Sequence, residues 1–183
     1  NCEILITQKT HIDCIYTNTL VSSNTKIGIE SNHISLNLFN TISKQFNDVE
    51  WRETKDIVEH IAAVKDAGEI ESLKTAIEIT DVVFDQIIPE LKVGAKEIEI
   101  SAKISYLFKM NGAEGDSYEP IIASGYLGAL PHARPSDKLF ENGDFIVMDF
   151  GALYNGYHAD MTRTVLIGRP TDKHNEIYQA VLE

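Results

Sequence analysis

The segment Phe145–Val165, FIVMDFGALYNGYHADMTRTV, decides how this chain folds, because it has the pattern of a β-hairpin. Its first residues form a short apolar run, which is typical of a strand buried on both faces. Asn155-Gly156 is the strongest short signal for a hairpin turn, since both residues tolerate a positive φ. From Asp160 onward, polar and apolar residues alternate and several are β-branched, which predicts the second strand.

The predicted hairpin carries two aspartates, Asp149 on its first strand and Asp160 near its second. A two-residue turn would pair Asp149 with Thr162, which places Asp160 diagonal to Asp149 on the same face. A bulge, for which Gly151 is a candidate, would bring the two aspartates level. The register therefore predicts two neighbouring carboxylates.

Two carboxylates at this position need a physical explanation. Buried charges cost several kcal/mol each, and like charges at close range raise one another's pKa. A divalent cation between them removes both penalties, and some aminopeptidases use metal pairs held by such hard oxygen ligands. The alternative is a pair of solvated aspartates at the mouth of the hairpin.

Several motifs occur in order around the hairpin, and they are ASG at 123–125, LPH at 130–132, MDFGALYNGY at 148–157 and DMTRT at 160–164. This series resembles the pita-bread metallopeptidase superfamily, above all its Xaa-Pro dipeptidase (prolidase) and Xaa-Pro aminopeptidase branch. The resemblance continues more weakly back to about Lys26 and forward to Glu183. It implies an α+β fold, with part of a pita-bread (creatinase/aminopeptidase-like) domain preceded by the end of an α/β amino-terminal domain.

The resemblance also implies the site residues. Asp149 and Asp160 would be ligands of a centre of two divalent metal ions, for which Mn, Co, Zn and Fe are all compatible. His132 would lie beside the substrate and assist proton handling. From the residues alone, an exposed loop histidine is the favoured interpretation of His132, although Pro131 stiffens its loop. The family's other ligands, one histidine and two glutamates, come from a part of the chain later than Glu183.

The activity implied for the complete protein is hydrolysis of the bond between an amino-terminal residue and proline. The expected partner is a proline-containing peptide, and the complete protein is expected to be a homodimer. The chain as given is expected to be an incomplete, inactive part of it. Two alternatives remain, which are a metal-free pita-bread homologue that binds peptides or proteins, and a creatinase-like hydrolase. Neither would need the Asp149–Asp160 pair.

Composition limits the partners and the cellular setting that can be expected for this chain. The chain has 16 Lys and Arg against 28 Asp and Glu, a net charge of −12, which argues against nucleic acid or an anionic membrane as partner. It contains neither a signal-peptide pattern nor an apolar run long enough for a membrane span. Cys2 and Cys14 have no metal-ligand spacing. A reducing, cytoplasmic setting is the simplest interpretation.

Two domains are expected, with the end of the amino-terminal domain at residues 1–64 and the first half of the pita-bread domain at 65–183. Asp66 can cap a long helix, with Glu69 as its capping-box partner. The expected strands before this boundary are 3–7, 26–30 and 49–53, and the expected helices are 34–46 and 56–64. After the boundary, helices are expected from 66 to about 91, from 96 to 110, and from 171 to the end of the chain. Because nothing stops that last helix, we expect a fragment of a longer protein.

Two further residues near the aspartates are candidates. His158 lies two positions before Asp160, so it could share that face and bind metal, although the resemblance places no ligand there. Arg163 falls on the opposite face from Asp160, where it could support the site from behind or form a structural ion pair.

Overall fold

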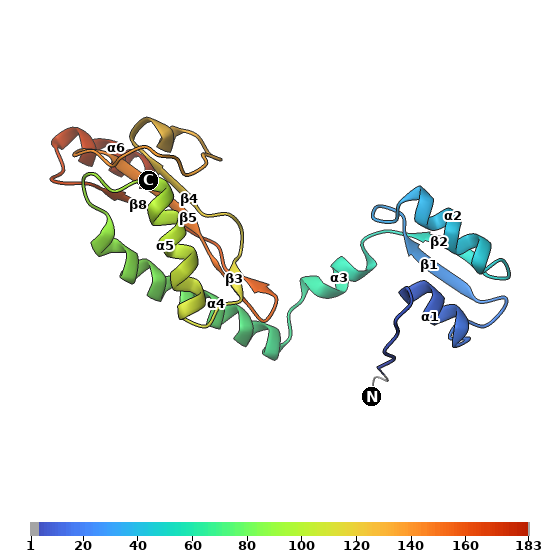
Figure 1. Cartoon of the computed structure of the whole chain (residues 1–183). Coiled ribbons are helices and arrows are strands. Elements are labelled where there is room, and N and C mark those ends of the chain that lie inside the picture. The colour runs from blue at the N-terminus through green and yellow to red at the C-terminus, as the bar shows by residue number, and fades with distance from the viewer. Residues whose placement is uncertain (1–3, 183) are drawn as a thin grey trace. The chain divides into compact units, whose positions relative to one another are not determined.

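The computed structural model describes residues 4–182, and the chain divides into two units between Val64 and Lys65 (Figure 1). The first unit alternates helices and strands, in the order α1 (His11–Thr17), β1 (Lys26–Glu30), α2 (Leu36–Gln45), β2 (Glu50–Thr54) and α3 (Ile57–Ala63). Strands β1 and β2 are parallel neighbours with α2 between them in sequence, which is the predicted βαβ order.

The prediction of a strand at residues 3–7 in the first unit is wrong. Residues 4–7 form no strand, and Glu3 lies outside the described residues. The sheet of this unit contains only β1 and β2 in the described part of the chain, and the apolar run Ile4-Leu5-Ile6 pairs with neither strand. Helix α1 follows instead, and Thr10 caps it by accepting a hydrogen bond of 3.1 Å from the amide of Asp13.

The second unit contains helices α4 and α5, two three-stranded antiparallel sheets and helix α6 (Figure 1). One sheet has the order β4-β5-β8 and the other the order β3-β6-β7. The bounds of these elements are α4 (Ala67–Ile87), η1 (Ile88–Glu90), α5 (Glu97–Met110), β3 (Gly115–Asp116), β4 (Ile121–Ser124), η2 (Gly125–Ala129), β5 (Phe145–Phe150), β6 (Ala152–Tyr154), β7 (Tyr157–His158), β8 (Met161–Leu166) and α6 (Asp172–Leu182). No helix in the described part of the chain is both long and apolar enough to cross a membrane.

Helix α4 begins at the predicted capping box. The Asp66 side chain accepts a hydrogen bond from the Glu69 amide at 2.9 Å, and the Glu69 side chain accepts one from the Asp66 amide at 2.7 Å. The helix ends at Ile87, earlier than predicted, and a single 3₁₀ turn follows. Pro89 explains this end, because proline lacks an amide hydrogen and its ring clashes with the preceding helical turn.

The predicted hairpin is confirmed. Its first arm is β5 followed by β6, and its second is β7 followed by β8. Tyr154 pairs with Tyr157 across a two-residue turn, in which Asn155 has a φ of 49° and Gly156 a φ of 76°. Positive φ at both central residues defines a type I′ turn, the geometry that matches the twist of the two arms.

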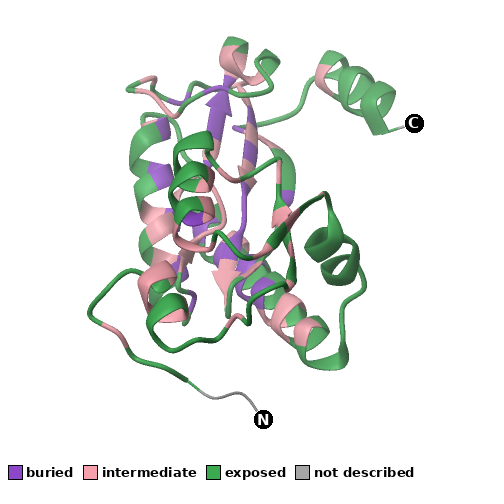
Figure 2. Ribbon diagram, turned by 90° about the vertical axis from the view of Figure 1, so that its right-hand side faces the viewer, coloured by how far each residue is buried: buried purple, intermediate pink, exposed green. Residues whose placement is uncertain are grey.

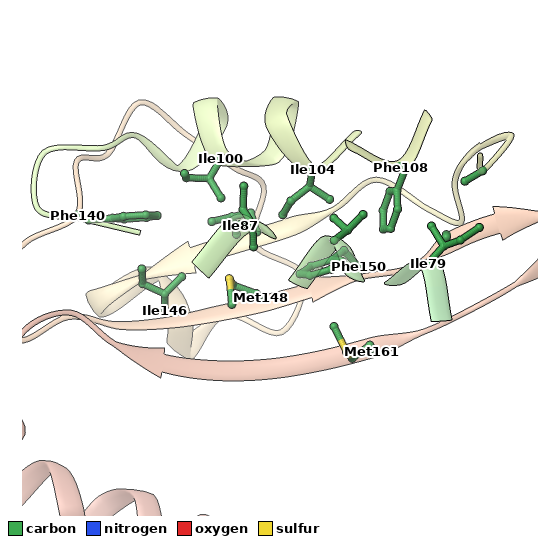
Figure 3. Packing of buried hydrophobic residues seen from close by; sticks show 14 of the residues in the cluster. Ile79, Ile87, Ile100, Ile104, Phe108, Phe140, Ile146, Met148, Phe150 and Met161 are labelled. Carbon is green, nitrogen blue, oxygen red and sulfur yellow. The ribbon is translucent and has the colours of Figure 1, made fainter. Parts of the chain in front are cut away.

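Helices α4 and α5 cover one face of the β4-β5-β8 sheet. Figure 3 shows Ile104 and Phe108 of α5 facing Met148 and Phe150 of β5, and Figure 2 shows that the buried residues gather on these strands and on the helix sides that face them. Alternate residues of β5 therefore pack in the core, and each fully buried side chain of this size contributes about 1.5–3 kcal/mol. Asp149 is on the opposite face, away from the two helices.

Candidate metal centre and active site

Asp149 pairs with Thr162 across β5 and β8, which is the predicted register. Asp160 lies two residues before Thr162, so Asp149 and Asp160 are diagonal neighbours on the same face of the hairpin. Asp149 is half-buried, whereas Asp160 is exposed. The predicted sharing of a face is confirmed, and the face is the one that the core helices leave open.

The bulge considered at Gly151 is absent. The β5–β8 ladder ends at the pair Phe150–Met161, and the β6–β7 ladder begins at the pair Leu153–His158. Two residues lie between these pairs on each arm, so Gly151 lies directly opposite Asp160. At this point the two backbones approach closely, because a Cβ on residue 151 would overlap the carbonyl oxygen of Ala159. Glycine is needed here for close approach, and the register continues without an extra residue.

A residue that the sequence did not predict, Tyr118, joins the two carboxylates. Its hydroxyl lies 2.5 Å from Oδ1 of Asp149 and 2.8 Å from Oδ1 of Asp160. A phenolic hydroxyl has one hydrogen, so it donates to one carboxylate at a time. Because both oxygens contact the same hydroxyl, they are no farther apart than the sum of these two distances. The two carboxylates therefore converge on one point.

A bulge in the neighbouring strand places Tyr118 there. Asp116 of β3 pairs with Ala152, and Ile121 of β4 pairs with Asp149. Residues 117–120 thus face only residues 150 and 151 of the hairpin. Such an excess of residues on one strand re-aims a side chain, and here it turns Tyr118 toward the aspartates. The sequence signal for it is Pro120, since proline within a strand marks an edge or a bulge.

The environment of Tyr118 favours its neutral form. Burial raises the pKa of Tyr118 above its ordinary value of 10.0, and the hydrogen bonds to Asp149 and Asp160 raise this pKa further. The negative charges of the two carboxylates act in the same direction, since a phenolate beside them would be repelled. At neutral pH the hydroxyl therefore remains a donor between two acceptors.

His132 lies in the loop that follows η2, and its side chain is exposed. It lines a pocket of about 320 Å³ together with Tyr118, Pro120 and Ile121. Arg134, which also lines the pocket, forms an ion pair with Glu119. The structure thus brings His132 beside the tyrosine that contacts both aspartates, although its catalytic role stays a prediction.

His158 does not join the aspartates. Its Nδ1 lies 3.2 Å from the carbonyl oxygen of Ser117, and the ring is exposed. Arg163 pairs with Met148 in the sheet, which confirms that it falls on the opposite face from Asp160. The Arg163 guanidinium donates to the carbonyl oxygen of Thr162 at 2.9 Å, and it forms no ion pair with another described residue.

The donor set of the site fits a divalent cation. Asp149 and Asp160 present carboxylate oxygens, the ligand type that hard divalent ions prefer, and these oxygens converge on one point. Within residues 4–182 no group of three or more His, Cys, Asp and Glu side chains could hold a metal ion. The described residues therefore offer a metal ion two carboxylates at this point, fewer ligands than such an ion requires.

The model of metallopeptidase family M24 matches residues 71–183. The chain belongs to this family. Over 157 residues, the M24 chain is 43% identical to an Xaa-Pro dipeptidase of Pyrococcus horikoshii, and the match covers 86% of this chain and 44% of that protein. An Xaa-Pro dipeptidase of Pyrococcus furiosus is 42% identical over the same length, with 45% of that protein covered.

Solved structures give the same result for the M24 fold. An X-Pro aminopeptidase from Thermotoga maritima superposes with a TM-score of 0.87 at 41% identity, and the match covers 97% of this chain and 50% of that one. The prolidase from Pyrococcus furiosus superposes with a TM-score of 0.81 at 38% identity over 97% of this chain and 51% of its own. The chain thus has the predicted pita-bread fold in part, and it spans about half the length of these relatives.

Proposed function

We propose that the complete protein that carries this chain is a metal-dependent peptidase, which hydrolyses the bond between an amino-terminal residue and proline. The observation that carries this proposal is the convergence of Asp149 and Asp160 on the hydroxyl of Tyr118. Tyr118 lines one pocket together with His132. The Xaa-Pro dipeptidases and the X-Pro aminopeptidase to which the chain is similar support it. A dipeptide or longer peptide with proline in second position would be the substrate.

Asp149 and Asp160 would hold two divalent ions, and Mn, Co, Zn and Fe all suit ligand sets of carboxylate and imidazole. Such ions, when bound, polarise the scissile carbonyl and activate water at neutral pH. The hairpin would contribute rigid positioning, because both carboxylates belong to one uninterrupted register. Tyr118, which contacts both carboxylates, would orient them from the side of the neighbouring strand.

His132 would act in hydrogen bonding and proton transfer during hydrolysis. Hydrolysis adds the oxygen of water to the carbonyl carbon, breaks the bond from that carbon to the prolyl nitrogen and transfers a proton to this nitrogen. The imidazole of His132 can donate a hydrogen bond to the carbonyl oxygen as negative charge develops, or protonate the leaving nitrogen. Its exposed position in the pocket beside Tyr118 supports contact with the substrate.

We further infer the organisation of the complete protein. Residues 1–64 would be the end of a creatinase-like amino-terminal domain, and residues 65–183 the first half of the pita-bread domain. The boundary between the two units of the structure supports this division. The complete protein would be a cytoplasmic homodimer that acts on peptides and not on nucleic acid or membranes, and the net charge of −12 on the 183-residue chain supports this choice of partner.

Chelation tests the proposed activity. The complete protein is treated exhaustively with a chelator, assayed on a dipeptide ending in proline, and assayed again after Mn²⁺ or Co²⁺ is added back. We expect activity to disappear and return, and a dipeptide ending in alanine serves as the control substrate. Proline dipeptide hydrolysis that survives chelation would exclude the proposal, and so would full activity in the Asp149→Asn variant.

A further inference from the structure

Glu97, the first residue of α5, is a buried carboxylate outside the aspartate site. None of its surface is accessible to solvent, and an isolated buried carboxylate is unfavourable unless hydrogen bonds satisfy it. Its Oε1 accepts bonds from the amide and the hydroxyl of Ser124, at 2.7 and 2.8 Å. Its Oε2 accepts bonds from the amide and the hydroxyl of Ser136, at 3.1 and 2.7 Å. One side chain thus satisfies four donors.

The direction of these bonds is fixed by Lys138. Its ammonium group donates to the hydroxyl oxygen of Ser124 at 2.9 Å, and its backbone amide donates to the hydroxyl oxygen of Ser136 at 3.1 Å. Each serine oxygen is therefore an acceptor for Lys138, which leaves its own hydrogen for Glu97. The side chain at position 97 must therefore accept hydrogen bonds at both of its terminal atoms. A carboxylate does so with its two oxygens, whereas an amide has one oxygen and one NH₂ group, which is a donor.

The two serines mark the ends of the loop that carries His132. Ser124 is the last residue of β4, and Ser136 follows residues 125–135, which comprise η2 and the loop after it and which we call the 125–135 loop. The first turn of α5 also binds the far end of the loop through its backbone, since the amide of Ile98 donates to the carbonyl oxygen of Ser136 at 3.0 Å. Glu97 thus joins both ends of the 125–135 loop to the start of one helix.

A short, stiff segment separates this junction from the imidazole. Between Ser136 and His132 lie Pro135, whose φ is fixed by its ring, and Ala133, whose side chain is buried. The amide of Ala133 donates to the carbonyl oxygen of Leu130 at 3.2 Å, which closes a turn around His132. A displacement at Ser136 would therefore move His132 rather than be absorbed by the loop.

The other end of the junction belongs to the sheet of the aspartates. Ser124 pairs with Ile146 of β5, the strand that carries Asp149. We propose that Glu97 is a positioning residue, which fixes His132 relative to the Asp149–Asp160 pair by joining the 125–135 loop to this strand. The assignment to catalysis rests on the proposed function. Glu97 itself lies in the core and touches neither aspartate.

Glu97→Gln in the complete protein tests the proposal, because the amide group places a donor against the donors of one serine. We expect kcat on a proline dipeptide to fall by about 10- to 100-fold, the size of effect that a misplaced catalytic group produces. KM and metal content should stay within about twofold, since binding and ligands are untouched. Glu99→Gln, an exposed residue of the same helix turn, is the matched control and should keep full activity.

A double variant separates positioning from general damage to the fold. If Glu97 acts through His132, adding Glu97→Gln to His132→Ala should lower kcat no further than His132→Ala alone. If the two single substitutions each lower kcat and their effects multiply in the double variant, the proposal is overturned. If Glu97→Gln fails to fold, Ser136→Ala replaces it in the same comparison with His132→Ala. This milder substitution removes one of the four hydrogen bonds that Glu97 accepts.

Hydrogen exchange of the complete protein tests the junction without reference to activity. Glu97→Gln should accelerate exchange of the amides of the 125–135 loop at least tenfold relative to Glu99→Gln, while the β5 amides keep their protection. Unchanged loop exchange would overturn the role of Glu97 even in an active enzyme. A complete protein that shows the loop effect but cleaves no Xaa-Pro substrate would refute the proposed function and leave the junction standing.

Discussion

Gly151 lies directly opposite Asp160 in the hairpin, and its backbone packs against the segment that carries this carboxylate. The close approach lets the β5–β8 register continue into the β6–β7 register without an extra residue. Any side chain at 151 would push the two strands apart. The diagonal relation of the two aspartates, on which the metal hypothesis depends, therefore requires glycine at this position.

Gly151→Ala should destabilise the chain by about 1–3 kcal/mol, the cost of forcing an extra methyl group into a close-packed region. Urea denaturation measures the change in the free energy of unfolding. The matched control is Gly115→Ala, because a Cβ at 115 in β3 would meet no atom within 4 Å. Equal effects of the two substitutions would contradict the close approach at Gly151.

Tyr118→Phe should destabilise the chain by about 1–3 kcal/mol, because it removes a hydrogen bond to charged groups and leaves two carboxylates without their shared donor. Thermal or urea unfolding of the chain without added metal gives the value. Tyr126→Phe is the control, since Tyr126 is 77% exposed, and it should change stability by less than about 0.5 kcal/mol. A Tyr118→Phe variant as stable as the control would show that the bridging hydroxyl contributes nothing.

The raised pKa of Tyr118 sets the direction of a pH effect. Burial, followed by the bonds to Asp149 and Asp160, raises this pKa in the folded chain, so the unfolded chain ionises first as the pH rises. The stabilisation by Tyr118 is then complete below about pH 10, the ordinary tyrosine pKa, and declines above it. We expect the stability difference between the wild type and Tyr118→Phe to be constant from pH 7 to 9 and to shrink above pH 10. A difference that grows above pH 10 would mean that the shift has the opposite sign.

His132→Ala in the complete protein should lower kcat by about 10²–10³, the effect of removing one donor to a developing oxyanion. Metal content should be unchanged, because His132 is not predicted to be a ligand. His158→Ala is the informative control, since His158 lies near Asp160 in sequence but bonds to Ser117, and it should alter neither activity nor metal content. Metal lost in step with activity in His132→Ala would assign it as a ligand.

The 183-residue chain by itself should bind no pair of divalent ions tightly. Asp149 and Asp160 together offer at most four carboxylate oxygens, whereas each ion takes four or more ligands. Titration calorimetry with Mn²⁺ or Co²⁺ should detect only weak binding, which Asp149→Asn abolishes. Tight binding of two ions per chain would mean that residues other than the two aspartates complete the site.

The parts of the site that follow local rules could be predicted from the sequence. The Asn155-Gly156 turn fixes the register of the hairpin, and the register fixes the shared face of Asp149 and Asp160. The capping box at Asp66 and Glu69 is equally local, since both bonds span three residues.

The parts that depend on distant contacts could not be predicted. Tyr118 reaches Asp149 from 31 positions away, and it does so through a bulge whose only sequence signal is Pro120. From the sequence pattern, Glu97 cannot be distinguished from any other acidic residue in the first turn of a helix. Its burial depends on Ser124 and Ser136, which are 27 and 39 positions away. Periodicity carries no information about such pairs.

The two-residue turn also has a consequence for the order in which the chain folds. Hairpins with such short turns close in about 1–10 μs, because little loop entropy is lost, so Asp149 and Asp160 can meet early. Tyr118 and the Glu97 junction depend on much longer loops and are expected to join later. During folding the two carboxylates therefore face each other in water before any donor lies between them. Their repulsion is weak there, where the dielectric constant is high and salt screens the charges, and it becomes costly only as the surrounding strands close.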